Sequence, residues 1–318
     1  ARTPWLDRTA PYFPRVVPHQ DGAGVIRAVG EGVSPERIGE RVWFFEAQFN
    51  RASGSAAEFV SLPQDNAIRL PEDIIFEEGA CLGVPAMTAH RCIFGDGEVR
   101  GKTVLVTGAA GAVGRFSVQF ARQGGARVIA TVSNARQARL AKEAGAHFTI
   151  NRHEEDIPRR IAEITGAPDG RAIDRIVEVA FGENLSTTLA VLRHGGIVST
   201  YSSDTQPEPA LPFWSLLGLD ATVHFVLVYT MPWQAHLDAI AAITEGLEKG
   251  WLSCKISQIY PLEECWKAHE AVEAGGNSGK ILVCPDPEQL GFSSLGKPLA
   301  YVGMVCHACG HENGIDRI

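Results

Sequence analysis

The sequence predicts an α/β fold in which a doubly wound parallel sheet is inserted into a discontinuous β-rich domain. Three observations carry this prediction. Residues 1–85 are rich in Gly and Pro and hold only short β-like runs, residues 86–249 alternate apolar strands with amphipathic helices, and the β-type pattern returns over residues 250–285. Continuous apolar strands separated by helices are typical of a parallel sheet that helices cover on both faces.

Composition limits both the size of the core and the class of partner. The 318 residues are 45% hydrophobic, enough for one large core or two smaller ones. A net charge of −8 offers no basic face, so we expect neither a nucleic-acid nor a membrane partner. No apolar run approaches the roughly 18–20 residues of a membrane span. The seven cysteines are irregularly spaced, which argues against a disulfide framework and predicts a cytoplasmic protein.

The expected β-rich segment begins with short strands. Alternation and flanking turn residues predict strands over residues 24–30, 39–44 and 57–63, the last ended by proline. No stretch before Phe76 is long enough for a helix. We expect an antiparallel arrangement here.

The middle of the chain supplies the parallel sheet. Apolar runs predict strands over residues 103–107, 127–131, 147–150, 175–179, 196–200 and 223–228. Helices fill the gaps, and a long helix is expected over residues 233–249. A strand (256–260), a helix (262–274) and a strand (280–283) follow. Residues 286–318 lack periodicity and are expected to form a tail.

A glycine-rich turn at residues 107–114, Thr-Gly-Ala-Ala-Gly-Ala-Val-Gly, follows an apolar strand and opens a helix. This is a variant of the dinucleotide-binding fingerprint of Rossmann domains, with Ala109 in place of the first glycine. Gly111 should allow close approach to the pyrophosphate, and Gly114 should allow close helix–strand packing. A tight turn in an unrelated α/β protein is the alternative. The residues expected to bind the pyrophosphate are Gly108, Ala110, Gly111, Ala112, Val113 and Gly114.

The next strand indicates which dinucleotide is bound. An NAD site places a carboxylate about 20 residues beyond the turn, where it holds the ribose hydroxyls. Here the strand ends in Ser133, Asn134 and Arg136 instead, and Arg152 follows the third strand. Guanidinium groups suit a 2′-phosphate, so the sequence predicts NADPH, bound by these four residues. The arginines could equally be solvated surface residues.

Several motifs, in order, carry a family resemblance. Residues 18–26 (Pro-His-Gln-Asp-Gly-Ala-Gly-Val-Ile) resemble the opening motif of medium-chain dehydrogenases/reductases, and residues 79–89 resemble the helix that joins their two domains. With the glycine turn, residues 177–182 and residues 277–280, the likeness runs from about residue 10 to 285. The chain is most similar to the zinc-free quinone oxidoreductase, or ζ-crystallin-like, branch.

The resemblance implies a GroES-like catalytic domain over residues 1–85 and 250–285 and an NADPH-binding Rossmann domain over residues 86–249. Family members carry strands ahead of the opening motif, so the catalytic domain is expected to lack its first strands. The family is also dimeric or tetrameric. A homodimer or homotetramer is therefore expected, with residues 223–228 as a candidate edge strand between subunits.

The resemblance also implies site residues. Thr88 and Tyr201 are the candidate catalytic residues, although Thr88 could instead pack or cap its helix and Tyr201 could be a packed aromatic. Further coenzyme contacts are expected from Ala180, Phe181, Asn277 and Lys280. An apolar pocket for the acceptor is expected from Phe213, Trp214, Phe225 and Tyr229.

A catalytic metal is not expected. Zinc-dependent relatives carry Gly-His-Glu where this sequence has His19, Gln20 and Asp21, so the ligand position falls on glutamine, a poor zinc ligand. His19 is one place off and would point to the other side of an extended segment. Residues 306–311, Cys-His-Ala-Cys-Gly-His, resemble half a zinc site but are expected to belong to the unstructured tail.

These expectations combine into a function. The sequence predicts NADPH-dependent hydride transfer to quinones or α,β-unsaturated carbonyls, without metal, in a cleft lined by hydrogen-bond donors. Three alternatives stay open: an enoyl-thioester reductase of the same superfamily, a non-catalytic NADPH-binding protein of crystallin-like or RNA-binding type, and a zinc alcohol dehydrogenase.

Overall fold

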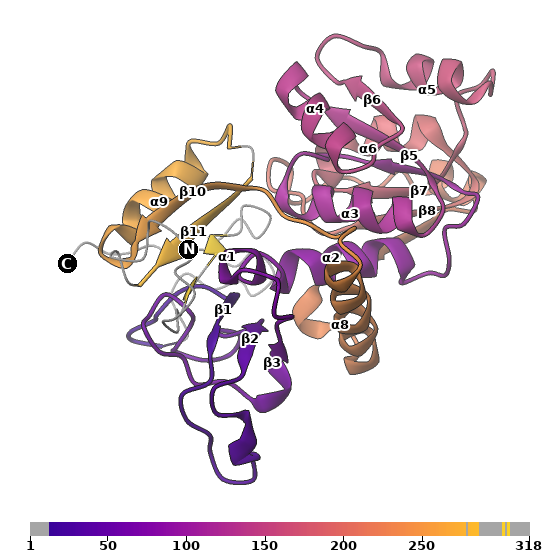
Figure 1. The fold of residues 1–318 in the computed structure, drawn as a ribbon. Coiled ribbons are helices and arrows are strands. Elements are labelled where there is room, and N and C mark those ends of the chain that lie inside the picture. The colour runs from indigo at the N-terminus through magenta and orange to yellow at the C-terminus, as the bar shows by residue number, and fades with distance from the viewer. Residues whose placement is uncertain (1–12, 278, 286–300, 303, 306–318) are drawn as a thin grey trace. The chain divides into compact units, whose positions relative to one another are not determined.

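The computed structural model describes residues 13–277 and 279–285 and the backbone of residues 301–302 and 304–305. The chain divides into two compact units (Figure 1). The first comprises Ala1–Met87 and Ile240–Ile318, and the second comprises Thr88–Ala239. The boundaries fall inside two helices, α2 (Gly83–Phe94) and α8 (Trp233–Glu248).

The second unit is built on a six-stranded sheet of order β6-β5-β4-β7-β8-β9, in which every neighbouring pair is parallel. All six predicted strands are present, within a few residues of their expected bounds. The strand order reverses between β4 and β7, where α/β sheets bind ligands outside the carboxyl ends of their strands. The strands are β4 (Thr103–Val106), β5 (Arg127–Val132), β6 (Phe148–Asn151), β7 (Ile173–Glu178), β8 (Leu192–Thr200) and β9 (Thr222–Phe225).

Capping residues fix the starts of two helices of this unit. The Asn134 side chain accepts from the Gln137 N–H at 3.0 Å at the start of α4, and the Asp156 side chain accepts from the Arg159 N–H at 2.8 Å at the start of α5. The helices are α3 (Ala112–Gln123), α4 (Ala135–Glu143), α5 (Ile157–Thr165), α6 (Phe181–Val191) and α7 (Phe213–Gly218), followed by a 3-10 turn, η3 (Val228–Thr230).

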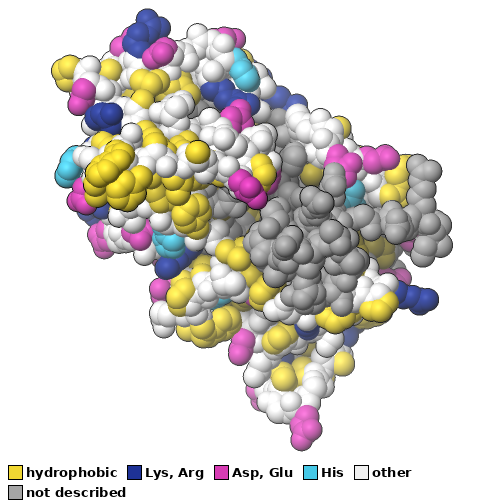
Figure 2. All heavy atoms as spheres, turned by 180° about the vertical axis from the view of Figure 1, so that it is seen from behind, with side chains coloured by type: hydrophobic (Ala, Val, Ile, Leu, Met, Phe, Trp, Pro, Cys, Tyr) yellow, Lys and Arg dark blue, Asp and Glu magenta, His cyan; other side chains and the backbone are white. Residues whose placement is uncertain are grey.

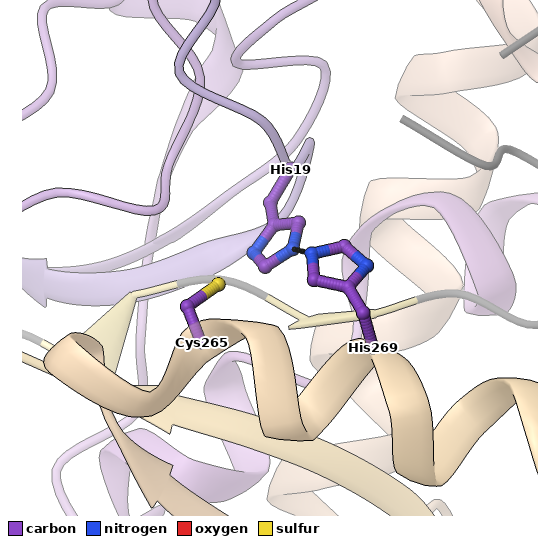
Figure 3. Close-up of side chains that lie close together, drawn as sticks. All are labelled: His19, Cys265 and His269. Carbon is purple, nitrogen blue, oxygen red and sulfur yellow. Dashed lines mark hydrogen bonds between the residues drawn. The ribbon is translucent and has the colours of Figure 1, made fainter. Parts of the chain in front are cut away.

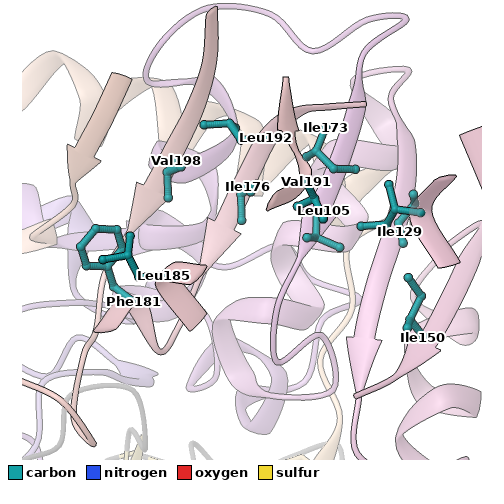
Figure 4. Close-up of a cluster of buried hydrophobic side chains, with 11 residues drawn as sticks. Leu105, Ile129, Ile150, Ile173, Ile176, Phe181, Leu185, Val191, Leu192 and Val198 are labelled. Carbon is teal, nitrogen blue, oxygen red and sulfur yellow. The ribbon is translucent and has the colours of Figure 1, made fainter. Parts of the chain in front are cut away.

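One face of the sheet is filled by a cluster of aliphatic side chains and one aromatic (Figure 4). These side chains come from the strands and from α5 and α6, as the continuous apolar runs predicted. Burial of each stabilises the unit by about 1.5–3 kcal/mol. The cluster comprises Leu105, Ile129, Ile150, Ile161, Ile173, Ile176, Phe181, Leu185, Val191, Leu192 and Val198.

The first unit contains two small sheets. In one, the order is β12-β1-β2-β3 and all pairs are antiparallel; in the other, β10 and β11 are parallel and β13 is antiparallel to β11. The strands are β1 (Gly22–Val25), β2 (Arg41–Phe44), β3 (Ala67–Arg69), β10 (Ile256–Pro261), β11 (Lys280–Cys284), β12 (Tyr301–Val302) and β13 (Met304–Val305). The helices are α1 (Phe76–Gly79) and α9 (Cys265–Glu273), with 3-10 turns η1 (Pro35–Arg37), η2 (Gln64–Asn66) and η4 (Leu262–Glu264).

Two predictions for this unit were wrong. Residues 57–63 form no strand: residues 57 and 58 lie in a bend, where the Ala57 N–H turns back onto the Ser55 carbonyl at 2.8 Å, and residues 59–63 are irregular. The sheet takes its third strand from β3 instead, whose three residues are too few to show a pattern. The expected tail also contains β12 and β13, which pair with β1 and β11. Residues 306–311 lie outside the described residues.

Within the described residues, no helix has both the length and the apolar character that crossing a membrane requires.

Candidate dinucleotide-binding site

The glycine turn lies at the carboxyl end of β4, beside the strand-order reversal. Gly108 has φ +60° and is exposed, a left-handed conformation that suits glycine. The Gly111 N–H donates to the Gly108 carbonyl at 2.9 Å, which closes the turn. The turn therefore presents backbone, with little side chain, to whatever lies beyond the strand.

Helix α3 starts directly after the turn, with Gly111 as its N-cap and no side chain capping it. The first-turn N–H groups of Ala112, Val113 and Gly114 have no intrahelical acceptor, and the helix dipole adds positive potential there. Gly111 is itself exposed. These features fit a pyrophosphate, which needs converging N–H donors and close approach of the backbone.

Gly114 holds the helix against the turn. A Cβ at this position would lie 2.2 Å from the Gly108 carbonyl oxygen and 2.8 Å from the Ala109 Cα. Both neighbours are backbone, so only glycine fits without displacing the turn. The close packing expected of the third glycine is present.

Glu178, at the end of β7, is a residue of this region that the sequence analysis did not single out. Its carboxylate is fully buried, and Oε1 accepts from Thr107 Oγ1 (3.0 Å), the Ala180 N–H (2.6 Å) and Asn184 Nδ2 (2.8 Å). Burial raises the pKa of this carboxyl, opposed by those hydrogen bonds. Glu178 thus ties the residue before Gly108 to the end of β7. The sequence feature that could have identified Glu178 is a charged residue inside the apolar run Ile-Val-Glu-Val.

The ends of β5 and β6 bring together two of the residues expected to bind a 2′-phosphate. Arg152 Nε donates to Ser133 Oγ at 3.0 Å, and Arg152 also lies 3.7 Å from a Glu183 carboxylate oxygen. Arg136 is exposed on the first turn of α4. Asn134 caps that helix, so its side-chain oxygen is already engaged.

Three further predicted residues gather at the carboxyl ends of β7 and β8. The Phe181 N–H donates to the Ser202 carbonyl at 3.1 Å, and the Tyr201 N–H donates to the Glu178 carbonyl at 3.3 Å. Tyr201 is half-buried, whereas the Phe181 ring is 2% exposed within the core. Phe181 therefore offers this end of the sheet its backbone rather than its ring. Ala180 directs its N–H to Glu178.

The remaining coenzyme candidates belong to other elements of the two units. Thr88 is buried on α2. Asn277 and Lys280 belong to the first unit: the Asn277 side-chain amide donates to the Ala271 carbonyl at the end of α9, and Lys280 is buried at the start of β11.

Of the four aromatic residues expected to wall the acceptor pocket, Trp214 lines a cavity that Phe213, Phe225 and Tyr229 do not line. This cavity, of about 820 Å³, is lined by Trp214 together with Arg171 and His194, at the amino ends of β7 and β8. This is the opposite end of the sheet from the glycine turn. Phe225, at the end of β9, packs edge-on against Phe181, with ring centroids 5.6 Å apart.

Large hydrophobic side chains are also exposed around α7 and β9, and Figure 2 shows such side chains gathered on the rear of the molecule. The Phe213 and Trp214 rings contact each other edge-on, with centroids 5.2 Å apart. Tyr229 is half-buried in η3. The exposed residues are Leu211, Phe213, Trp214, Leu217 and Phe225.

In the first unit, Gln20 occupies the position that carries a zinc ligand in zinc-dependent relatives. Its Oε1 accepts from the Gln48 N–H at 3.0 Å, and its Nε2 donates to Gln48 Oε1 at 3.3 Å. Both polar atoms of the Gln20 side chain are thus engaged in hydrogen bonds within the first unit.

Comparison with known proteins fixes the family. A family model described as zinc-binding dehydrogenase matches residues 112–242. The quinone oxidoreductase of Mus musculus is 33% identical over 270 residues, which cover 84% of this chain and 79% of the relative. The chain belongs to the quinone oxidoreductase family. This confirms the resemblance to the ζ-crystallin-like branch of the medium-chain dehydrogenases/reductases and makes the protein an oxidoreductase.

Solved structures confirm the fold of this family member. The Escherichia coli quinone oxidoreductase, complexed with NADPH, matches with a TM-score of 0.74 and 25% identity, covering 86% of this chain and 85% of that one. An NAD-dependent alcohol dehydrogenase matches equally well, with a TM-score of 0.74 and 27% identity over 86% of this chain and 83% of that one. Fold likeness therefore leaves the choice of coenzyme to the residues of this chain.

Proposed function

We propose that this quinone oxidoreductase family member is an NADPH-dependent reductase of quinones or α,β-unsaturated carbonyls that uses no catalytic metal. The observation that carries the proposal is the Ser133–Arg152 contact at the ends of β5 and β6. By their position after β5 and β6, Ser133 and Arg152 would supply a hydroxyl and a guanidinium where an NAD site holds a carboxylate. The Escherichia coli relative of the same fold is complexed with NADPH, so the fold accepts this coenzyme.

The coenzyme's pyrophosphate would lie against the exposed glycine turn and the first-turn N–H groups of α3. Arg152, Ser133 and the exposed Arg136 would hold the 2′-phosphate through charge-assisted hydrogen bonds. Asn134 contributes by capping α4 and so fixing Ser133 and Arg136 on either side of the cap. When bound, NADPH supplies the hydride.

The nicotinamide end is proposed to face Ala180, Phe181 and Tyr201, whose backbone is held by Glu178 and Ser202. Tyr201 is half-buried, so its side chain is partly accessible to an acceptor. Thr88 and Tyr201 are the proposed hydroxyl donors to the acceptor carbonyl, and a tyrosine hydroxyl or water would deliver the proton that follows hydride transfer. Asn277 and Lys280 complete the proposed coenzyme contacts.

Independence from metal is supported by Gln20. Glutamine is a poor zinc ligand beside cysteine or histidine, and both polar atoms of this side chain are engaged with Gln48. Without a metal, hydrogen-bond donors must polarise the acceptor. A zinc alcohol dehydrogenase would lose activity on treatment with a chelator, whereas this proposal predicts full activity.

We propose a cytoplasmic homodimer or homotetramer. β9 is an edge strand of the six-stranded sheet, and Phe225 on it is 64% exposed, which supports self-association at that edge. The described cysteines, Cys81, Cys92, Cys254, Cys265 and Cys284, are free thiols.

The test is oxidation of NADPH by the purified protein against a naphthoquinone, an enal and crotonyl thioester in parallel, followed by the absorbance of reduced nicotinamide. Turnover with the quinone or the enal supports the proposal. A strong preference for the thioester assigns the protein as an enoyl-thioester reductase instead. Binding of NADPH without turnover on any acceptor assigns it as a coenzyme-binding module.

A further inference from the structure

Outside the coenzyme site, the first unit brings together three side chains with metal-binding atoms (Figure 3). His19 comes from the loop before β1, and Cys265 and His269 come from α9. Residues four apart on a helix share one face, so α9 presents both side chains towards His19. One ligand atom from each residue lies within 4.8 Å of the other two.

The separations fit a tetrahedral zinc ion. His19 Nε2 and His269 Nε2 are 3.1 Å apart. Zn–N bonds of about 2.0–2.1 Å at a tetrahedral angle place two nitrogens about 3.3–3.4 Å apart, and Zn–S of about 2.3 Å places sulfur and nitrogen about 3.6 Å apart. The two Nε2 atoms are therefore nearly at their ligand spacing, and the Cys265 sulfur lies within 4.8 Å of one nitrogen of each ring.

His19 is held in place by its backbone. Its φ of +80° lies in the left-handed region, which is rare for a residue other than glycine. The Ser55 N–H bonds to the His19 carbonyl at 3.1 Å, and a Cβ on Gly54 would lie 2.4 Å from the same oxygen. The loop is thus fixed by close contact with residues 54–56.

The imidazole pair leaves a buried nitrogen unsatisfied. Only one hydrogen can lie between two neutral rings that face each other through Nε2, and His19 Nδ1 is buried with no hydrogen-bond partner among the described residues. Glu273, one helical turn beyond His269, supplies the carboxylate whose charge acts on that ring.

We propose that His19, Cys265 and His269 bind one zinc ion, which links the segment before β1 to α9. Two imidazoles and one thiolate leave a fourth position for water or another ligand. Binding converts the Cys265 thiol to a thiolate and releases one proton to solvent. Gln20, adjacent to His19, stays engaged with Gln48, so this site is separate from the ligand position of zinc-dependent relatives.

The test measures zinc itself. Full-length protein is treated with a chelator, dialysed and titrated with zinc chloride against a chromophoric chelator, and metal content is measured by mass spectrometry. We expect one zinc per chain, with affinity reduced at least 100-fold in Cys265→Ser, His19→Gln and His269→Gln. Cobalt in place of zinc should give a thiolate charge-transfer band in the near ultraviolet that Cys265→Ser abolishes.

Two controls make the result decisive. Cys254→Ser removes another half-buried thiol of the same unit and should leave zinc affinity unchanged. The double variant Cys306→Ser/Cys309→Ser removes both cysteines of the Cys-His-Ala-Cys-Gly-His segment and should also leave zinc affinity unchanged. Zinc lost only in that double variant, zinc unaffected by the three site variants, or no zinc bound at all would each overturn the proposal. His269 is only half-buried, so His269→Gln tests the site even where His19→Gln fails to fold.

Discussion

Arg152 donates a hydrogen bond from Nε to the Ser133 hydroxyl at 3.0 Å. The two residues follow neighbouring parallel strands, β5 and β6, whose last residues, Val132 and Asn151, are in register. The contact therefore sets a cation and a hydroxyl side by side at the carboxyl edge of the sheet. It is the feature on which the coenzyme assignment rests.

The first prediction concerns Arg152. Replacement by alanine should weaken NADPH binding about 10–100-fold and leave NADH binding unchanged, because a hydrogen bond to a charged group contributes about 1.5–3 kcal/mol. Arg139→Ala removes another exposed arginine, on α4, and as the matched control should change neither affinity. Calorimetric titration measures both. An equal loss of affinity for the two coenzymes would mean that Arg152 does not bind the 2′-phosphate.

The second prediction concerns Ser133. Ser133→Asp restores the carboxylate typical of NAD sites, so it should repel the 2′-phosphate and accept the ribose hydroxyls. The ratio of NADH to NADPH affinity should rise at least 100-fold. Ser133→Asn, which keeps a polar but uncharged side chain, should shift the ratio far less. An unchanged ratio in Ser133→Asp would place the adenosine ribose elsewhere.

The third prediction concerns Gly114. Gly114→Ala pushes a methyl group against backbone at 2.2 Å, so α3 must move away from the turn at a cost of about 1–3 kcal/mol. We expect a lower unfolding temperature and weaker binding of both coenzymes. Gly218→Ala is the control, since a Cβ there meets nothing within 4 Å. If Gly114→Ala bound both coenzymes with wild-type affinity, the glycine turn would not be part of the binding site.

The fourth prediction is a pH dependence of Glu178. Burial raises the pKa of its carboxyl above the ordinary value of 4.5. Above pH 4.5 the unfolded chain loses this proton while the folded protein keeps it, so this group lowers the free energy of unfolding as pH rises towards the folded pKa. Glu178→Gln cannot titrate, so its stability relative to wild type should rise with pH from about 4.5 upward. Denaturant unfolding across pH measures the difference, and a stability difference that stays constant with pH would contradict the prediction.

The fifth prediction concerns His90, whose ring packs between Phe94 and Phe120 with centroids 5.0 and 5.4 Å away. Burial lowers the pKa of His90 from 6.5 to about 4. As pH falls from 6.5 towards 4, the unfolded chain takes up a proton that the folded protein does not, so stability is lost. Between pH 6.5 and 4, the free energy of unfolding should therefore fall less steeply with pH in His90→Phe than in the wild type, by at most about 1.4 kcal/mol per pH unit. The same slope in His90→Phe as in the control His153→Phe would contradict this.

The parallel sheet was predictable because each of its strands is a continuous apolar run long enough to identify by itself. β3 and the pair β12 and β13 were not, since strands of two or three residues exist only through their partners. The glycine turn carries its own signal, because the positive φ at Gly108 favours glycine and the backbone contact at Gly114 leaves no room for a Cβ.

Contacts between distant residues could not be predicted in this way. His19 and His269 are 250 positions apart, and only the fold brings their rings together. Periodicity could place Cys265 and His269 on one helix face, but it could not predict that this face contacts His19. Sequence also could not show that Trp214 lines a cavity at the amino ends of β7 and β8 while Phe225 is the last residue of β9.

The most direct test of the coenzyme assignment is calorimetric titration of the purified wild-type chain with NADPH and with NADH under identical conditions. Recognition of the 2′-phosphate by Ser133, Arg136 and Arg152 predicts NADPH binding at least 10-fold tighter than NADH. Equal or tighter binding of NADH, or binding of neither, would contradict it.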